Sequence, residues 1–141
     1  MINWFRKEKK FLDCSVLVVE DSDVDRKIIV RALEKLTCRV LTAGDGQEGY
    51  EMALANKPDI ILSDCSMPRM DGVEMCKMIK KSEEIKDIPI IFLTGLDSPK
   101  VVIDCFELDA ENFMCKPINP RLLTSQVEQI IKEHFLDRRN S

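Results

Sequence analysis

The chain has few histidine, glycine and aromatic residues and no long apolar run. Among 141 residues it has one histidine, one tryptophan and one tyrosine. No apolar stretch approaches the roughly 18–20 residues that a membrane-spanning helix needs. Residues 1–11 are basic and lack the apolar core of a secretory signal. We therefore expect a cytoplasmic protein without a membrane partner.

The pattern of cysteine and histidine excludes two classes of stabilised small protein. Six cysteines stand at positions 14, 38, 65, 76, 105 and 115, without any C-x-x-C pair. Cys14, Cys105 and Cys115 lie inside apolar runs, where a thiol packs as a small hydrophobe. We expect reduced thiols rather than a disulfide framework. A zinc site is not expected, because His134 is the only histidine and stands apart from the cysteines.

Charge is spread unevenly around a net value of −4. Residues 1–10 and 136–141 together hold six basic and two acidic side chains, which leaves 15 basic and 23 acidic in residues 11–135, a net charge of −8. An acidic body argues against direct nucleic-acid binding, which needs a basic face. We predict a basic N-terminal extension at 1–10, one domain at 11–135 and a C-terminal tail at 136–141.

Short apolar runs alternate with helical patterns along the chain. After the first run, Val24, Ile28 and Ala32 recur at helical spacing. The predicted strands are 15–19, 39–43, 59–63, 89–93 and 112–115, and the predicted helices are 22–36, 47–56, 72–81, 98–108 and 120–135. Continuously apolar strands favour a parallel sheet covered on both faces. The pattern predicts a single doubly wound α/β domain with a five-stranded parallel sheet and five helices.

Polar residues follow the strands at the ends that a parallel sheet brings to one edge. Glu20 and Asp21 follow the first strand, Asp64 the third, Thr94 the fourth and Lys116 the fifth. Doubly wound sheets bind their ligands at this edge. Taken alone, each residue could be a solvated loop residue, a helix cap or a surface lysine. Their convergence indicates a site.

The residue types at this edge suit phosphoryl transfer. Neighbouring carboxylates repel unless a cation lies between them, and Mg²⁺ prefers oxygen ligands. A carboxylate can also act as nucleophile and become an aspartyl-phosphate. A hydroxyl and an ammonium are suitable partners for the phosphoryl oxygens.

Four segments resemble the signatures of a known family. They are "VLVVEDS" at 16–22, "DIILSDCSMPRMDG" at 59–72, "IIFLTG" at 90–95 and "FMCKP" at 113–117. In order and separation, over about residues 13–135, they resemble the receiver (CheY-like) domains of two-component response regulators. The resemblance implies a flavodoxin-like sheet with strand order 2-1-3-4-5.

The resemblance also implies roles for individual residues. Asp64 would accept a phosphoryl group from a phosphohistidine on a sensor histidine kinase or phosphotransfer protein. Mg²⁺ would be held by Asp21, Asp64 and the backbone carbonyl of Ser66, with Glu20 helping through water. Lys116 would bind a phosphoryl oxygen, and the bond from Lys116 to the following proline is commonly cis in the family.

A conformational switch is implied as well. Thr94 would bind another phosphoryl oxygen and reorient, and the aromatic ring of Phe113 would move inward with it. The output surface would comprise 98–108, 112–115 and 120–135, for a downstream protein target or a homodimer. Two departures from the family pattern are Glu20, where Asp is commoner, and Phe113, which lacks a tyrosine hydroxyl.

Three functions compete. The first, which we favour, is a phosphoacceptor switch that assists its own phosphotransfer and dephosphorylation without being an enzyme. The second is a receiver-like binding module that never cycles. The third is an aspartate-nucleophile phosphatase using the D-x-D fragment Asp21-Ser22-Asp23.

The sequence also leaves the terminal segments open. The chain could be a stand-alone receiver or part of a longer protein with an output domain. "MINWFRKEKK" at 1–10 could be an amphipathic segment for a membrane surface or partner. We favour a packed or frayed terminal extension.

Overall fold

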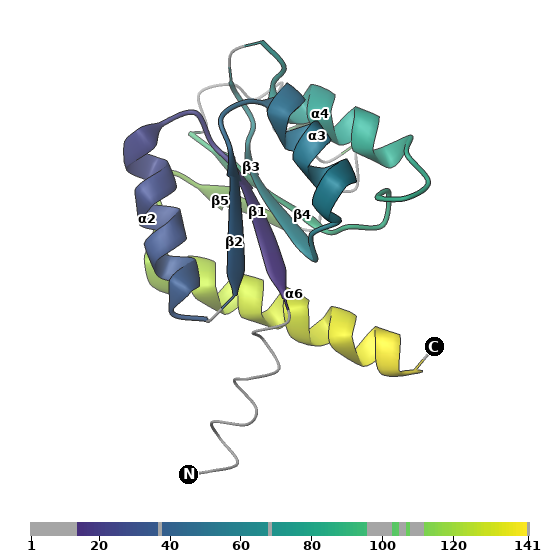
Figure 1. The fold of residues 1–141 in the computed structure, drawn as a ribbon. Helices are drawn as coiled ribbons and strands as arrows, with labels where there is room; N and C mark the ends of the chain where they lie inside the picture. Colours follow the sequence, from purple (N-terminus) through teal and green to yellow (C-terminus); the bar gives the residue numbers. More distant parts are fainter. Residues whose placement is uncertain are drawn as a thin grey trace.

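A five-stranded parallel sheet forms the centre of the molecule (Figure 1). The computed structural model describes residues 14–36, 38–67, 69–95, 103, 104, 107 and 112–140. The strands are β1 (Ser15–Val19), β2 (Arg39–Ala43), β3 (Ile60–Asp64), β4 (Ile90–Thr94) and β5 (Asn112–Cys115). Their order across the sheet is β2-β1-β3-β4-β5. This confirms the predicted doubly wound α/β fold and its strand order.

Four helices lie in the described part of the chain and cover both faces of the sheet. They are α2 (Asp23–Glu34), α3 (Gly46–Asn56), α4 (Gly72–Lys80) and α6 (Pro120–Asn140). Helices α2 and α6 cover one face, and α3 and α4 cover the other (Figure 1). Of the fifth predicted helix, 98–108, only residues 103, 104 and 107 are described, and these are helical. The predicted N-terminal extension lies outside the described residues.

Side-chain caps set where three of the helices begin. Ser22, Asp45 and Asp71 each accept a hydrogen bond from the backbone N–H three residues ahead, which satisfies a donor that the first turn leaves unpaired. The last helix was predicted to end at Phe135 but continues to Asn140, since no glycine or proline interrupts residues 136–140.

Two strands start one residue later than the apolar pattern predicted. Asp59 precedes β3, and its Oδ2 accepts a hydrogen bond of 2.8 Å from Ser15 N. Pro89 precedes β4, and its carbonyl accepts from Ile61 N at 2.9 Å. Each shift places the polar residue of the predicted site, Asp64 or Thr94, as the last residue of its strand.

The sheet separates two apolar cores because side chains alternate along each strand. Val16 and Val18 of β1 face the α2 and α6 side, while Leu17 and Val19 face the α3 and α4 side. The first core is completed by helix residues Ile29, Ala32, Leu33, Leu123, Val127, Ile130 and Ile131, and the second by Ala53, Val73, Met75, Cys76 and Ile79. Burial on both faces holds the strand ends in fixed positions.

The cysteines that the structure describes form no disulfide with one another. Cys14, Cys38, Cys65 and Cys76 are buried, as packing residues should be. Cys115 is exposed at the end of the edge strand β5, so the prediction that a thiol in an apolar run packs as a small hydrophobe is wrong for this residue. Among the described helices, none is long and apolar enough to cross a membrane.

Candidate functional site

Asp64 stands at the carboxyl end of the central strand β3. Its neighbours in the sheet are β1 and β4, and the next amide, Cys65 N, donates to Leu93 O at 3.0 Å. The Asp64 side chain is 11 % exposed. A buried strand thus carries a carboxylate to an edge where a ligand can reach it.

Helix α4 begins directly against the main chain of Asp64. A Cβ placed on Gly72 would lie 2.1 Å from Asp64 O and 2.9 Å from Ser63 Oγ, so no residue with a side chain fits there without a shift. Gly72 N also donates to Cys65 O at 3.0 Å. The Asp71-Gly72 pair of the sequence motif therefore lets the loop between β3 and α4 pack directly against the main chain of Asp64.

Glu20 and Lys116 are anchored in the same way, one residue beyond their strands. Glu20 N donates to Ala43 O at 3.0 Å, and Lys116 N donates to Thr94 O at 2.8 Å. The peptide bond from Lys116 to Pro117 is cis, as the resemblance implied. Both side chains consequently start from main chain that is tied to the neighbouring strand.

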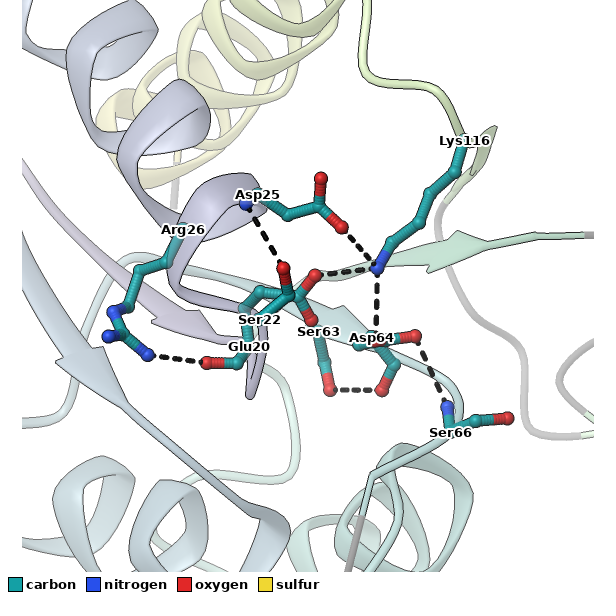
Figure 2. Close-up of polar contacts among 8 residues, drawn as sticks. All are labelled: Glu20, Ser22, Asp25, Arg26, Ser63, Asp64, Ser66 and Lys116. Carbon is teal, nitrogen blue, oxygen red and sulfur yellow. Dashed lines mark hydrogen bonds and ion pairs between the residues drawn. The ribbon is translucent and has the colours of Figure 1, made fainter.

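The Lys116 ammonium joins three carboxylates at the rim (Figure 2). Its Nζ lies 2.6 Å from Glu20 Oε1, 2.9 Å from Asp25 Oδ2 and 3.1 Å from Asp64 Oδ2. The Glu20 side chain is fully buried, whereas Asp25 is 28 % exposed. An ammonium has three N–H donors, so these contacts use all of them.

Burial and mutual contact change the acid–base properties of this group. Burial and the neighbouring Asp64 raise the pKa of Glu20 to about 8, although Lys116 acts in the opposite direction. Burial lowers the pKa of Lys116, but its hydrogen bonds to Glu20, Asp25 and Asp64 outweigh that effect and raise the pKa above the usual value. The site thus favours a charged lysine beside a carboxyl group that holds a proton readily.

Three carboxylates are close enough together to share a metal ion. Oxygen atoms of Glu20, Asp21 and Asp64 lie within 4.8 Å of one another. Glu20 Oε2 is buried and has no hydrogen-bond partner among the residues that the structure describes, which is costly for a carboxylate unless something binds it. An all-oxygen set with an unsatisfied buried oxygen fits a hard divalent cation.

The structure also places the other predicted site residues. Thr94 is the buried last residue of β4. The half-buried Phe113 ring stacks on Phe92, with centroids 6.1 Å apart. Ser66 is exposed, and its N–H donates to Asp64 Oδ1 at 3.2 Å (Figure 2). Glu20, Asp64 and Lys116 are in direct contact, Asp21 adjoins them, and Thr94 ends the neighbouring strand.

Two features of this edge were not predicted as parts of the site. Asp25 was not among the predicted site residues, although it is an acid four residues after Asp21, in the first turn of a helix that starts at the site. Arg69 has a positive φ of 65° and pairs with the buried Asp45 at 3.1 Å, and Gly46 N donates to Met70 O at 2.8 Å. These contacts attach the loop after β3 to the start of α3.

Comparison with known proteins gives a consistent result. Residues 16–128 match the response regulator receiver domain family. The chain is 35 % identical over 117 residues to the two-component response regulator ORR3 of Oryza sativa subsp. indica, covering 82 % of this chain and 89 % of that protein. It is 33 % identical to the alkaline phosphatase synthesis transcriptional regulatory protein PhoP of Bacillus subtilis, covering 83 % of this chain and 48 % of that protein.

Solved structures agree with the sequence relatives. The chemotaxis response regulator CheY4 of Vibrio cholerae superposes with a TM-score of 0.77 at 32 % identity, over 83 % of this chain and 98 % of that one. The signal receiver domain of a signal transduction histidine kinase from Syntrophus aciditrophicus gives a TM-score of 0.79 at 31 % identity, over 85 % and 91 % of the two chains.

Proposed function

The chain belongs to the receiver-domain family of response regulators, the phosphoacceptors of two-component signalling, and from that premise we propose that Asp64 is its phosphoacceptor. The observation that carries the proposal is the contact of Asp64 with Lys116 beside Glu20 and Asp21, at the carboxyl end of the central strand. The donor would be a phosphohistidine on a sensor histidine kinase or a phosphotransfer protein.

The reaction follows from the chemistry of the groups. An Asp64 carboxylate oxygen attacks the phosphorus of the phosphohistidine, a P–O bond forms, and the P–N bond breaks. The imidazole nitrogen leaves with the electron pair and takes a proton. Little covalent chemistry is required of the protein, so positioning and charge neutralisation dominate the rate.

This chain's residues would divide that task among them. Lys116 donates to a phosphoryl oxygen, and the Thr94 hydroxyl binds another. Glu20, Asp21, Asp64 and the Ser66 carbonyl would hold Mg²⁺, which when bound neutralises charge on the phosphoryl oxygens. With water in place of imidazole, the same groups would assist hydrolysis of the aspartyl-phosphate.

The conformational effect of phosphorylation would then be transmitted to the protein surface by Thr94 and Phe113. The Phe113 ring already stacks on Phe92 of β4, the strand that Thr94 ends, so a shift of Thr94 has an aromatic neighbour through which to act. We propose that the surface of residues 98–108, β5 and α6 contacts a downstream protein or a second copy of the chain.

One observation disfavours the phosphatase alternative. The second acid of its D-x-D fragment, Asp23, has a side chain that is 76 % exposed and is paired with Arg26 on the surface of α2. Among the described residues, Lys116 pairs with Glu20, Asp25 and Asp64 and not with Asp23.

Acetyl phosphate with Mg²⁺ tests the proposal directly. Mass spectrometry should show one added phosphoryl group on the intact protein, peptide mapping should place it at Asp64, and Asp64→Asn should abolish it. Asp23→Asn, on the exposed surface of α2, is the control and should label normally. An unlabelled wild type would refute the assignment. Turnover of p-nitrophenyl phosphate that is lost in Asp21→Asn but kept in Asp64→Asn would favour the phosphatase instead.

A further inference from the structure

Asp25 is the one carboxylate on Lys116 that lies outside the predicted phosphoacceptor set. Its Oδ2 accepts from Lys116 Nζ at 2.9 Å, which is shorter than the 3.1 Å to Asp64 Oδ2. Within the described residues, the group with metal-binding spacing comprises Glu20, Asp21 and Asp64 and does not include Asp25. The Lys116 ammonium is thus held from two sides, by the group that would bind ligands and by helix α2.

The local structure of α2 keeps Asp25 in place without the help of Lys116. Asp25 lies in the first turn of α2, and its N–H donates to Ser22 Oγ at 3.3 Å (Figure 2). The next residue, Arg26, donates from its guanidinium to Glu20 O at 3.0 Å. The first helical turn is therefore attached to the end of β1, and the Asp25 carboxylate is presented to Lys116 from a regular element.

The three contacts of Lys116 cannot all persist in a phosphorylated site. A lysine has three donors, and a phosphoryl oxygen needs at least one of them. Glu20 and Asp64 are the residues that the cation and the phosphoryl group would engage. Asp25 would bind neither the cation nor the phosphoryl group. It is therefore the partner that Lys116 can keep before, during and after phosphorylation.

We propose that Asp25 is a positioning residue that holds the Lys116 ammonium at the rim of the site while Glu20 and Asp64 turn to the cation and the phosphoryl group. The proposal rests on the phosphoacceptor function proposed above. Without Asp25, the remaining partners of Lys116 are the two carboxylates that the cation and the phosphoryl group engage, so the productive position of the ammonium is populated less. Losing a preorganised contact of this kind slows transfer without touching the nucleophile.

The experiment compares Asp25→Ala with Asp23→Ala, which removes an exposed carboxylate from the same helical turn without touching Lys116. The wild type is first shown to be phosphorylated at Asp64, so that failure of the proposed function is recognised separately. We expect Asp25→Ala to lower the phosphorylation rate at saturating acetyl phosphate about tenfold and Asp23→Ala to leave it unchanged within about twofold. Asp25→Asn, which preserves the side-chain shape, should slow transfer as well and replaces Asp25→Ala if that variant folds poorly.

Two further measurements separate positioning from a purely structural ion pair. The apparent affinity for beryllofluoride with Mg²⁺, followed by NMR chemical shifts, should weaken about tenfold in Asp25→Ala, because the analogue needs the same ammonium. In a Lys116→Ala background, Asp25→Ala should have no further effect beyond about twofold. Equal rates and analogue affinities in Asp25→Ala and Asp23→Ala would overturn the proposal, and so would effects of Asp25→Ala and Lys116→Ala that multiply.

Discussion

Glu20 is the most completely buried charged residue near the nucleophile, and its protonation links the site to pH. Its folded pKa of about 8 lies well above the ordinary value of 4.5, with burial as the largest cause. Between these values the folded protein keeps a proton that the unfolded chain has released. The stability from this group is thus complete below about pH 4.5 and is lost as pH rises through about 8.

We therefore predict that the metal-free protein loses stability as pH rises from about 5.5 to about 8.5. Glu20→Gln cannot lose the proton, so it should reduce this loss by at least about 1 kcal/mol. Urea denaturation in the presence of a chelator measures both curves. Identical pH dependence in wild type and variant would show that Glu20 does not titrate in this range.

At the scale of residues, the sequence predicted the site residues that follow the strands. It did not predict the side chains that approach the site from the helices. Glu20, Asp64 and Lys116 were predicted to converge because each follows a strand, and parallel strands share an edge. Asp25 lies in the first turn of α2 and Asp45 caps the start of α3, and their contacts with Lys116 and Arg69 depend on how the helices dock. Periodicity does not encode that docking.

At the scale of elements, the junction between β3 and α4 determines how closely the loop can follow the nucleophile. Gly72 is the first residue of α4, and its Cα packs on the carbonyl of Asp64. The sequence located this junction correctly through the Asp71-Gly72 pair. The sequence did not indicate how closely Gly72 approaches the carbonyl of Asp64, because that distance follows from how α4 packs on the sheet.

We predict that Gly72→Ala destabilises the protein by about 1–3 kcal/mol, since its Cβ would overlap the main chain of Asp64 and force a shift. Urea denaturation measures the loss, and acetyl phosphate labelling should slow with it because Asp64 moves. Gly44→Ala is the matched control: its Cβ would meet only Glu48 Oε2, at 3.8 Å, and should be tolerated. Equal stability of the two variants would contradict the steric argument.

The whole molecule consists of two cores with a sheet between them. Ile29 of α2 packs in one core and Ile79 of α4 in the other, and both are fully buried. The alternation of strands and helices predicted this arrangement. The helix ends were less predictable, because nothing in residues 136–140 stops α6 once it has started.

Substitutions in separate cores should act independently. Ile29→Val and Ile79→Val should each cost about 0.5–1.5 kcal/mol. In the double variant the costs should add to within about 0.5 kcal/mol, because the sheet keeps the two sites apart. Urea denaturation of the four proteins completes the cycle, and a larger departure from additivity would mean that the sheet transmits repacking from one face to the other.

The backbone ties at the rim have a mechanical consequence. Glu20, Cys65 and Lys116 each donate a main-chain hydrogen bond to the adjoining strand, one step past the end of their own strand. The main chain at these three positions is therefore fixed relative to the sheet. We expect the site to respond to a change of ligand by rotation about side-chain bonds rather than by movement of one strand past another. The sheet stays rigid, and only the side chains that project from its edge move.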